Sequence, residues 1–340
     1  MNAGFSVESV QTVIDSWQDR TNMDYEYMWG TFRAHIQAAT ISPSTPLSVL
    51  VQNFLQQVFE GGVTAGYVSN IRSCISVTLE LCLGYRLTQD AWSSRLAKGQ
   101  VNIRPDSPRY SETFDVDMLV RRVMSFGDNY DMPPQQLQAK VVILLRIALL
   151  ARSCDLAQVI YSESHVSRPH GLKVVLGRLK PDSTVQIHRD IPLIPYYDEY
   201  PTACVASAVE AYMLRTKPRR ATMLSNRIPE AKMRRKDPVF KDRLLLGEDK
   251  TAFPIGAQRI AKISVMTMED AGIDVKVFKA ASIRMASANL NLDAGEDISD
   301  VMFRGRWKSV SVFKKFYERQ QRKIQLPHSV MAQMAGQRPS

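Results

Sequence analysis

The chain has 340 residues, of which 45% are hydrophobic and 23% charged, enough for two globular domains with their own cores. Its net charge of +10 is unevenly spread: residues 1–110 hold 8 Lys and Arg against 9 Asp and Glu, and residues 111–340 hold 36 against 25. The larger part therefore favours an anionic partner, nucleic acid first, with a solvated basic surface as the alternative.

Several classes of protein are excluded by what the sequence lacks. The longest apolar run, Val141–Ala151, is short and interrupted by Arg146, so it cannot span a bilayer. The five histidines are scattered without metal-ligand spacing, and the cysteines form no C-x-x-C pair. We therefore expect an intracellular protein with reduced cysteines and no metal site; these cysteines are Cys74, Cys82, Cys154 and Cys204.

Residues 1–100 are predicted to form a helical domain. Ser6 begins a helix that reaches Trp17, and Tyr25–Ile36 has helical spacing of large apolar residues. Pro46 opens a third helix that ends at Gly61 and Gly62, and Thr64 caps a fourth that closes near Gly84. These apolar stripes are typical of core packing.

Residues 101–112 contain two prolines and no periodicity, so we expect a linker there, followed by a second domain over residues 113–326 and a tail over residues 327–340. After a first helical signal, this domain is predicted to contain a long apolar helix over Gln135–Ile160. A small antiparallel sheet then follows, with a turn at Pro181–Ser183, and helices resume near Cys204; the expected strands are Leu172–Leu176, Val185–Ile187 and Ile191–Leu193.

The segment Arg215–Arg243 holds 11 Lys and Arg against 3 Asp and Glu. It is either a DNA-facing or nuclear-import patch, or a solvated loop. The candidates for DNA contact in it are Arg219, Arg220, Arg234 and Arg235.

Two arginines, a lysine, a tryptophan and a late tyrosine could carry phosphodiester chemistry; they are Arg152, Lys180, Arg284, Trp307 and Tyr317. Guanidinium groups stay charged and bind two phosphate oxygens at once, and a lysine can protonate a leaving alkoxide. A phenol attacks well when nearby cations lower its pKa and is later a good leaving group. Each residue alone is equally compatible with an ordinary surface or core role, so the hypothesis depends on their combination.

The pieces R-S-C-D-L, G-R-L-K and F-K-A-A-S-I-R … G-R-W-K-S-V-S-V-F-K-K-F-Y, in this order, resemble the catalytic boxes of the tyrosine recombinases, or phage integrase family. The resemblance covers nearly the whole chain. It implies a mainly α fold with a small three-stranded antiparallel sheet: a helical core-binding domain over residues 1–100 and an α+β catalytic domain. The last box and the N-terminal runs L-V-Q-N-F-L-Q-Q-V-F-E-G-G and I-R-S-C-I-S look most like recombinases of DIRS-type retroelements, which are mobile elements.

By this resemblance, Arg152 and Arg284 would clamp the scissile phosphate and Trp307 would buttress it. Lys180 would protonate the leaving 5′ oxygen, and Tyr317 would attack to form a 3′-phosphotyrosine bond. Asp155 would support the helix of the first arginine. The resemblance implies an enzyme that cuts and rejoins DNA without metal, ATP or any other cofactor.

One position departs from the family, which usually has His or Lys three residues before the second arginine. Here that residue is Ala281, which cannot accept a proton. The general base is therefore unassigned, with Lys279, Lys308 or a water as candidates. A recombinase-derived DNA-binding protein without catalysis is consequently one alternative, and a topoisomerase with the same chemistry is another.

The expected partner is double-stranded DNA, gripped between the two domains in a C-shaped clamp, with Arg72 and Arg86 as candidates for base contacts or as plain surface arginines. Recombination cuts two duplexes twice each, so four protomers are expected on DNA. The tail over residues 327–340 either packs on a neighbouring protomer or frays. A eukaryotic source would imply the nucleus.

Overall fold

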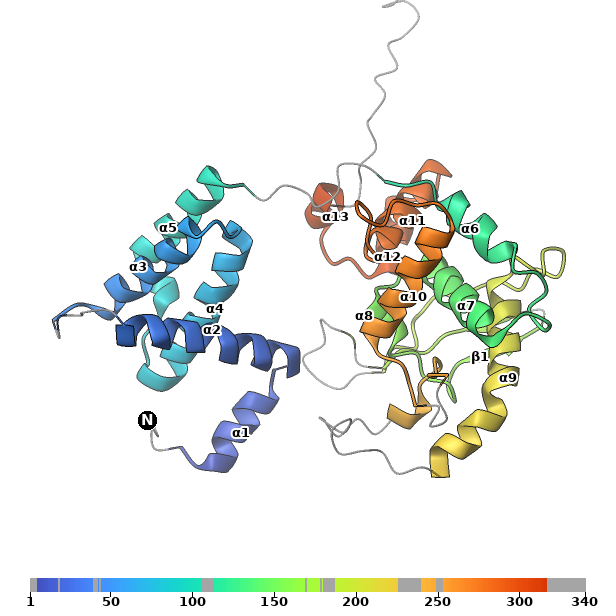
Figure 1. Cartoon of the computed structure of the whole chain (residues 1–340), viewed down its shortest axis with the longest axis horizontal. Coiled ribbons are helices and arrows are strands. Elements are labelled where there is room, and N and C mark those ends of the chain that lie inside the picture. Colours follow the sequence, from blue (N-terminus) through green and yellow to red (C-terminus); the bar gives the residue numbers. More distant parts are fainter. Residues whose placement is uncertain are drawn as a thin grey trace, which may run out of the picture. The chain divides into compact units, whose positions relative to one another are not determined.

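A computed structural model describes residues 5–17, 19–38, 42, 44–105, 113–168, 170–177, 179, 187–225, 240–248 and 253–316. The chain divides into two compact units, Met1–Arg109 and Tyr110–Ser340, each of which is described by itself (Figure 1). The described residues are mostly helical, with a small antiparallel sheet, as the sequence predicted.

All the elements in the described part of the first unit are helices. Its elements are α1 (Val7–Asp15), α2 (Asp19–Ala38), α3 (Leu47–Glu60), α4 (Ala65–Leu83), the 3₁₀ helix η1 (Leu87–Gln89) and α5 (Ala91–Ile103). The expected caps are present: the hydroxyl of Ser6 accepts from Ser9 N–H, and that of Thr64 accepts from Tyr67 N–H. Gly84 ends α4 in the left-handed conformation, which costs a glycine nothing.

The expected linker cannot start at residue 101, because α5 continues to Ile103. Asp90 caps this helix by accepting from Trp92 N–H, and the helix continues to Ile103. The guanidinium of Arg104 then stacks 4.3 Å from the ring centre of Phe59 and donates to Phe59 O, which fastens the helix end to α3. Residues 101–103 are therefore helical, and residues 106–112 lie outside the described residues.

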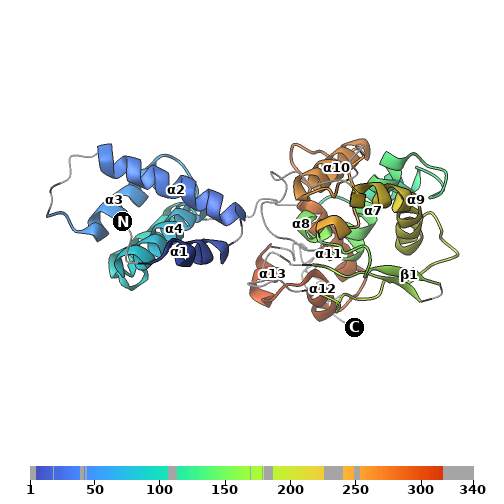
Figure 2. The same ribbon diagram turned by 90° about the horizontal axis from the view of Figure 1, so that it is seen from below.

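The second unit is built of helices around α7, with a two-stranded sheet (Figure 2). Its elements are α6 (Val116–Met124), α7 (Pro134–Ala148), α8 (Ser153–Leu156), β1 (His165–Ser167), β2 (Gly171–Lys173), α9 (Val205–Ser225), η3 (Phe240–Asp242), α10 (Ala257–Asp270), α11 (Ser282–Asp293), α12 (Ile298–Gly305) and α13 (Val310–Phe316).

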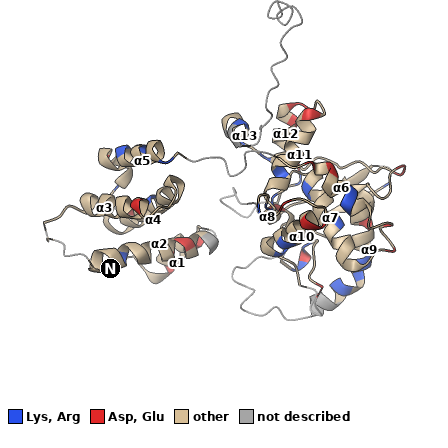
Figure 3. Cartoon of the chain, turned by 45° about the horizontal axis from the view of Figure 1, so that its top comes forward, with Lys and Arg blue, Asp and Glu red and all other residues tan. Residues whose placement is uncertain are grey.

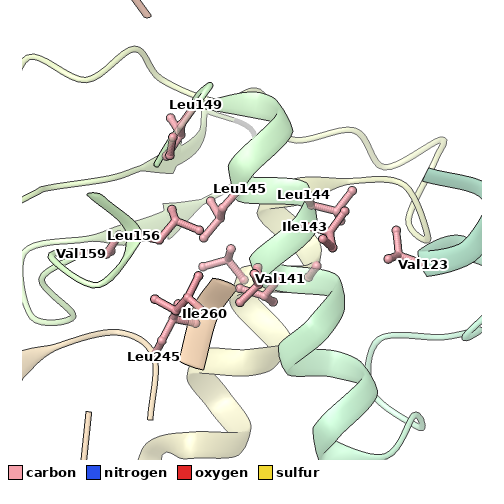
Figure 4. Packing of buried hydrophobic residues seen from close by; sticks show 14 of the residues in the cluster. Val123, Val141, Ile143, Leu144, Leu145, Leu149, Leu156, Val159, Leu245 and Ile260 are labelled. Atoms are coloured by element: carbon pink, nitrogen blue, oxygen red, sulfur yellow. The ribbon is translucent and has the colours of Figure 1, made fainter. Parts of the chain in front are cut away.

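Helix α7 is buried on most sides because its neighbours surround it. Val141 and Leu145 of α7 are fully buried and pack with Leu156, Val159 and Ile260 (Figure 4). Burying one such side chain contributes about 1.5–3 kcal/mol relative to an exposed one. This core holds α7, α8 and α10 together in fixed positions. Polar residues of the candidate site lie on these helices.

The helix expected over Gln135–Ile160 is in fact two helices. The Ala151 N–H donates to Arg146 O and the Leu150 N–H to Ile147 O, the pattern of a Schellman motif, with Leu150 in the left-handed conformation at φ 48°. That conformation costs a non-glycine residue about 1–2 kcal/mol. Burial offsets the cost, since Leu150 is fully buried against Trp307 and Phe313 in a second, smaller cluster.

The sheet is smaller than expected in its described part. Strands β1 and β2 pair antiparallel, with Val166 opposite Leu172. Isolated bridges join Leu172 to Ile194 and Leu176 to His188, so the chain near the expected third strand lies beside β2 without forming a strand. The expected turn at Pro181–Ser183 and residues 181–186 lie outside the described residues.

The basic segment begins as helix. Helix α9 includes residues 215–225, and η3 follows the stretch 226–239, which lies outside the described residues. Figure 3 shows Lys and Arg on α9 and also on α6 and α10. Among the described helices, none combines the length and the apolarity needed to cross a membrane.

Candidate active site

The carboxylate of Asp155 is the centre of the site. Its side chain is 1% exposed, and its Oδ2 lies 3.1 Å from Arg306 Nη2, 3.7 Å from Arg284 Nη1 and 3.8 Å from Arg152 Nη1. The same oxygen accepts from the backbone N–H of Arg152 at 3.0 Å. One buried carboxylate therefore gathers three guanidinium groups, and we call these four residues the Asp155 cluster.

Three short structural features bring these residues together. Arg152 is the N-cap of α8, and it follows the Schellman turn that ends α7. Arg284 is in the first turn of α11, and Arg306 follows the last residue of α12. Helices α11 and α12 pack on each other, and α7 packs on both α8 and α11 (Figures 1 and 2). Segments more than 100 residues apart in sequence therefore meet at Asp155.

Trp307 covers Arg284. The guanidinium carbon of Arg284 lies 4.0 Å from the centre of the Trp307 ring, and Arg284 Nη2 donates to Gly305 O. The ring of Trp307 packs edge-on against Phe313 of α13, with 4.8 Å between ring centres. A cation on an aromatic face in a desolvated place contributes about 2 kcal/mol. Arg284 is therefore held in one orientation, with 3% of its side chain exposed.

Gly305 makes room for this tryptophan. A Cβ atom added at Gly305 would lie 1.9 Å from Cζ3 of the Trp307 ring. The glycine of the G-R-W sequence is therefore needed for this packing, since any side chain at residue 305 would push the ring away from Arg284.

Arg146 is a buried arginine that links the segments around the Asp155 cluster. Its side chain is almost completely buried; Nη1 donates to Ser153 Oγ at 2.6 Å and to Ser264 Oγ at 3.2 Å, and Nη2 donates to Ala280 O. Burial lowers the pKa of Arg146 to about 10, so it remains charged at neutral pH. This arginine joins α7, α8, α10 and the segment before α11.

The arginines outnumber the acid that holds them. Within the described part of the chain, the Asp155 cluster sets three positive charges against one negative charge; Asp155 and Arg284 are almost fully buried, and Arg152 is 37% exposed. Concentrated positive charge of this kind binds an anion strongly, since the low local dielectric weakens screening. Guanidinium pairs suit the oxygens of a phosphate in particular.

Four of the residues predicted from the sequence meet here: Arg152, Asp155, Arg284 and Trp307. The two lysines proposed as stand-in bases are exposed: Lys279 Nζ donates to Val275 O at 2.6 Å, and Lys308 follows Trp307. Ala281 is the exposed N-cap of α11. Lys180 and Tyr317 lie outside the described residues.

The arginines predicted to contact DNA have varied surroundings. Arg72 Nε donates to Ser93 Oγ at 2.7 Å, Arg86 pairs with Glu80 at 3.0 Å, and Arg219 donates to Gly247 O at 2.7 Å. Arg234 and Arg235 lie outside the described residues.

The structure corrects the prediction for Arg220, because its buried guanidinium donates to backbone carbonyls inside the unit. Its guanidinium donates to Arg243 O and Leu244 O and lies 3.6 Å from the centre of the Tyr161 ring, so it is a core residue rather than a DNA contact.

Arg306 and Arg146 also belong to the site, although neither was predicted from the sequence. Arg306 precedes Trp307 in R-G-R-W, but only the fold brings it to Asp155, 151 residues away in sequence. Arg146 is the one charged residue in the apolar run Val141–Ala151, and a charge in such a run indicates a buried side chain with several polar partners.

No protein-family model matches the sequence, and no curated protein matches it. Solved structures do. An integrase of the Tn1549 transposon in complex with transposon right end DNA is 10% identical, with a TM-score of 0.57 over 94% of each chain. A lambda integrase fragment, solved as a dimer bound to a COC′ core site, is 12% identical, with a TM-score of 0.53 over 94% of this chain and 96% of that one.

A third match is the site-specific recombinase XerH bound to a palindromic difH substrate, 12% identical, with a TM-score of 0.54 over 93% of this chain and 79% of that one. At these identities the similarity establishes the fold, which is the fold of the tyrosine recombinases.

Proposed function

We propose that the chain is a tyrosine recombinase, a DNA integrase or recombinase that cuts and rejoins strands through Tyr317. The observation that carries the proposal is the Asp155 cluster, in which three arginines surround one carboxylate and Trp307 covers Arg284. It occurs in a fold shared with integrases and recombinases solved on DNA. The DIRS-type subgroup and a mobile-element origin remain predictions from the sequence.

The proposed reaction is a transesterification. Arg152 and Arg284 bind the non-bridging oxygens of the scissile phosphate and stabilise the charge that develops on them. The phenolic oxygen of Tyr317 bonds to phosphorus while the bond to the 5′ oxygen breaks, and Lys180 gives that oxygen its proton. The phenol proton passes to a base that we leave open between Lys279, Lys308 and a water, since Ala281 cannot take it. Attack by a 5′ hydroxyl on the phosphotyrosine reverses these steps, so the bond energy is conserved for rejoining.

We further propose that the partner is double-stranded DNA and that four protomers assemble on synapsed DNA. Residues 1–100 would form a core-binding domain, and residues 113–326 would form the catalytic domain. The solved integrases and XerH with this fold are complexes with DNA. Two cuts in each of two duplexes require four tyrosines.

A nicked suicide substrate tests the function. The full chain is mixed with DNA of candidate terminal sequence in the presence of a chelator, and a denaturing gel is used to look for a covalent protein–DNA adduct. Wild type should form the adduct; Tyr317→Phe should not, because the nucleophilic oxygen is gone, although it should bind the same DNA.

A DNA-binding protein that has lost catalysis is the second candidate, and Ala281 is the observation that favours it. Loss of an acid or base typically costs about 10²–10⁴ in rate. If wild type binds the DNA tightly and yields no adduct in prolonged incubation, this second function replaces the first.

A further inference from the structure

We propose that Arg306 is a third phosphate-binding guanidinium of the site, acting beside Arg152 and Arg284. This inference rests on the proposed phosphodiester cleavage and adds a residue to it. Three observations support it: the backbone of Arg306, the position of its side chain, and the charge balance of the Asp155 cluster.

The backbone of Arg306 has a conformation that favours glycine. Its φ is 57° and its ψ 46°, in the left-handed region. The Trp307 N–H donates to Met302 O and the Arg306 N–H to Phe303 O, so Arg306 occupies the position of a Schellman motif where glycine is usual. Such an outlier is retained where the side chain has a task, because glycine would end α12 without strain.

The side chain of Arg306 turns inward to the site. Its Nη2 donates to Asp155 Oδ2 at 3.1 Å, the shortest of the three guanidinium distances to that oxygen, and only 18% of the side chain is exposed. Its Nη1 is buried and has no hydrogen-bond partner within the described part of the chain. A buried donor of this kind is costly unless an acceptor reaches it, and a phosphate oxygen bound between the arginines is such an acceptor.

The charge of the cluster leads to the same assignment. Asp155 neutralises one of the three arginines, and the remaining two positive charges exceed what a single phosphodiester monoanion supplies in the ground state. As the tyrosine attacks, a second negative charge develops on the phosphate oxygens. The third guanidinium therefore matches the transition state better than the bound substrate, which is the requirement for accelerating the reaction.

The decisive variant is Arg306→Gly, because glycine fits the left-handed backbone and removes only the side chain. Arg304→Ala is the matched control: Arg304 lies in the last turn of α12 and pairs with Glu296, outside the Asp155 cluster. Loss of the Arg306–Asp155 contact is partly offset, because glycine relieves the left-handed backbone and Asp155 keeps Arg152 and Arg284 as partners. Thermal unfolding of both variants shows whether they are folded at the assay temperature, which separates a functional loss from a folding loss.

Cleavage is measured on a nicked substrate with an ordinary scissile phosphate and on one with a methylphosphonate, which lacks the ground-state negative charge. We expect Arg306→Gly to lose about 10²–10³ in adduct-formation rate on the phosphodiester, the usual effect of removing one such donor. On the methylphosphonate the loss should shrink to less than about tenfold, and Arg304→Ala should match wild type on both. A loss of equal size on both substrates would mean that Arg306 only positions Asp155 and would overturn the proposal, as would no loss on either.

Calorimetric titration with inorganic phosphate tests the role of Arg306 in anion binding without requiring DNA cleavage. Wild type and Arg304→Ala should bind phosphate at least about tenfold more tightly than Arg306→Gly. That result without any adduct would refute strand cleavage but support the anion site, whereas equal phosphate binding by all three chains would refute the role of Arg306.

Discussion

A single carboxylate, that of Asp155, lies within 4 Å of three arginine side chains and is itself almost fully buried. Its removal leaves positive charges facing one another in a place where water screens them poorly. Loss of one partner of a buried ion pair typically costs about 3–5 kcal/mol. The stability of the second unit and the geometry of the proposed site therefore depend on the same atom.

We expect Asp155→Asn, which keeps the shape and removes the charge, to lower the free energy of unfolding by about 3 kcal/mol in urea denaturation. The matched control is Asp117→Asn, because Asp117 is more than half exposed and lies 4.0 Å from Arg121 on α6; its loss should cost less than about 1 kcal/mol. Equal effects of the two substitutions would contradict the role of Asp155 as the centre of the cluster.

The sequence predicted Arg152, Asp155, Arg284 and Trp307 because their order resembles the catalytic boxes of the tyrosine recombinases, a resemblance that needs no coordinates. Arg306 could not be predicted in that way. Its importance lies in a left-handed φ and in a contact across 151 residues, and neither leaves a mark in the local pattern. The burial of Arg146 could be predicted from its apolar run, but its particular partners could not, because these serine and carbonyl groups come from three segments.

Helices were predicted well where caps and stripes are local. Ser6, Thr64 and Gly84 mark the ends of helices in the first unit just where expected. The break after Ala148 was missed because Leu149, Leu150 and Ala151 continue an apolar run. Tertiary packing decides there: Leu149 is buried in the main core and Leu150 in the cluster with Trp307, so the chain must turn between them.

The turn between α12 and Trp307 allows a prediction at the scale of a structural element. We expect Gly305→Ala to destabilise the chain by about 1–3 kcal/mol, because the new methyl group overlaps the Trp307 ring and forces it from Arg284. A thermal melt measures the loss, and adduct formation should fall with it, since Arg284 loses its cover.

Gly99→Ala is the comparison for that variant. Gly99 lies inside α5, and an added Cβ there meets nothing within 4 Å, so the substitution should stabilise the chain by about 0.5–1 kcal/mol. If Gly305→Ala were also stabilising, the packing described for Trp307 would be incorrect.

The whole molecule has an uneven charge, because residues 111–340 carry the basic excess. Proteins that neutralise phosphates with Lys and Arg release counterions, so their affinity falls steeply with salt. With about six such contacts, affinity for double-stranded DNA should drop about 10³-fold between 50 and 200 mM salt. Fluorescence anisotropy of labelled duplex with the full chain measures the slope, and a flat response would rule out phosphate-dominated DNA binding.

Identification of the linked residue and of the linked DNA end in the covalent adduct is the most direct test of the central claim. The adduct formed with chelator present is digested with protease and nuclease and analysed by mass spectrometry. The proposed mechanism predicts a single peptide in which Tyr317 carries the 3′ phosphate of the cut strand, with a free 5′ hydroxyl on the other product. A 5′ phosphate linkage, or a different residue bearing the DNA, would contradict it.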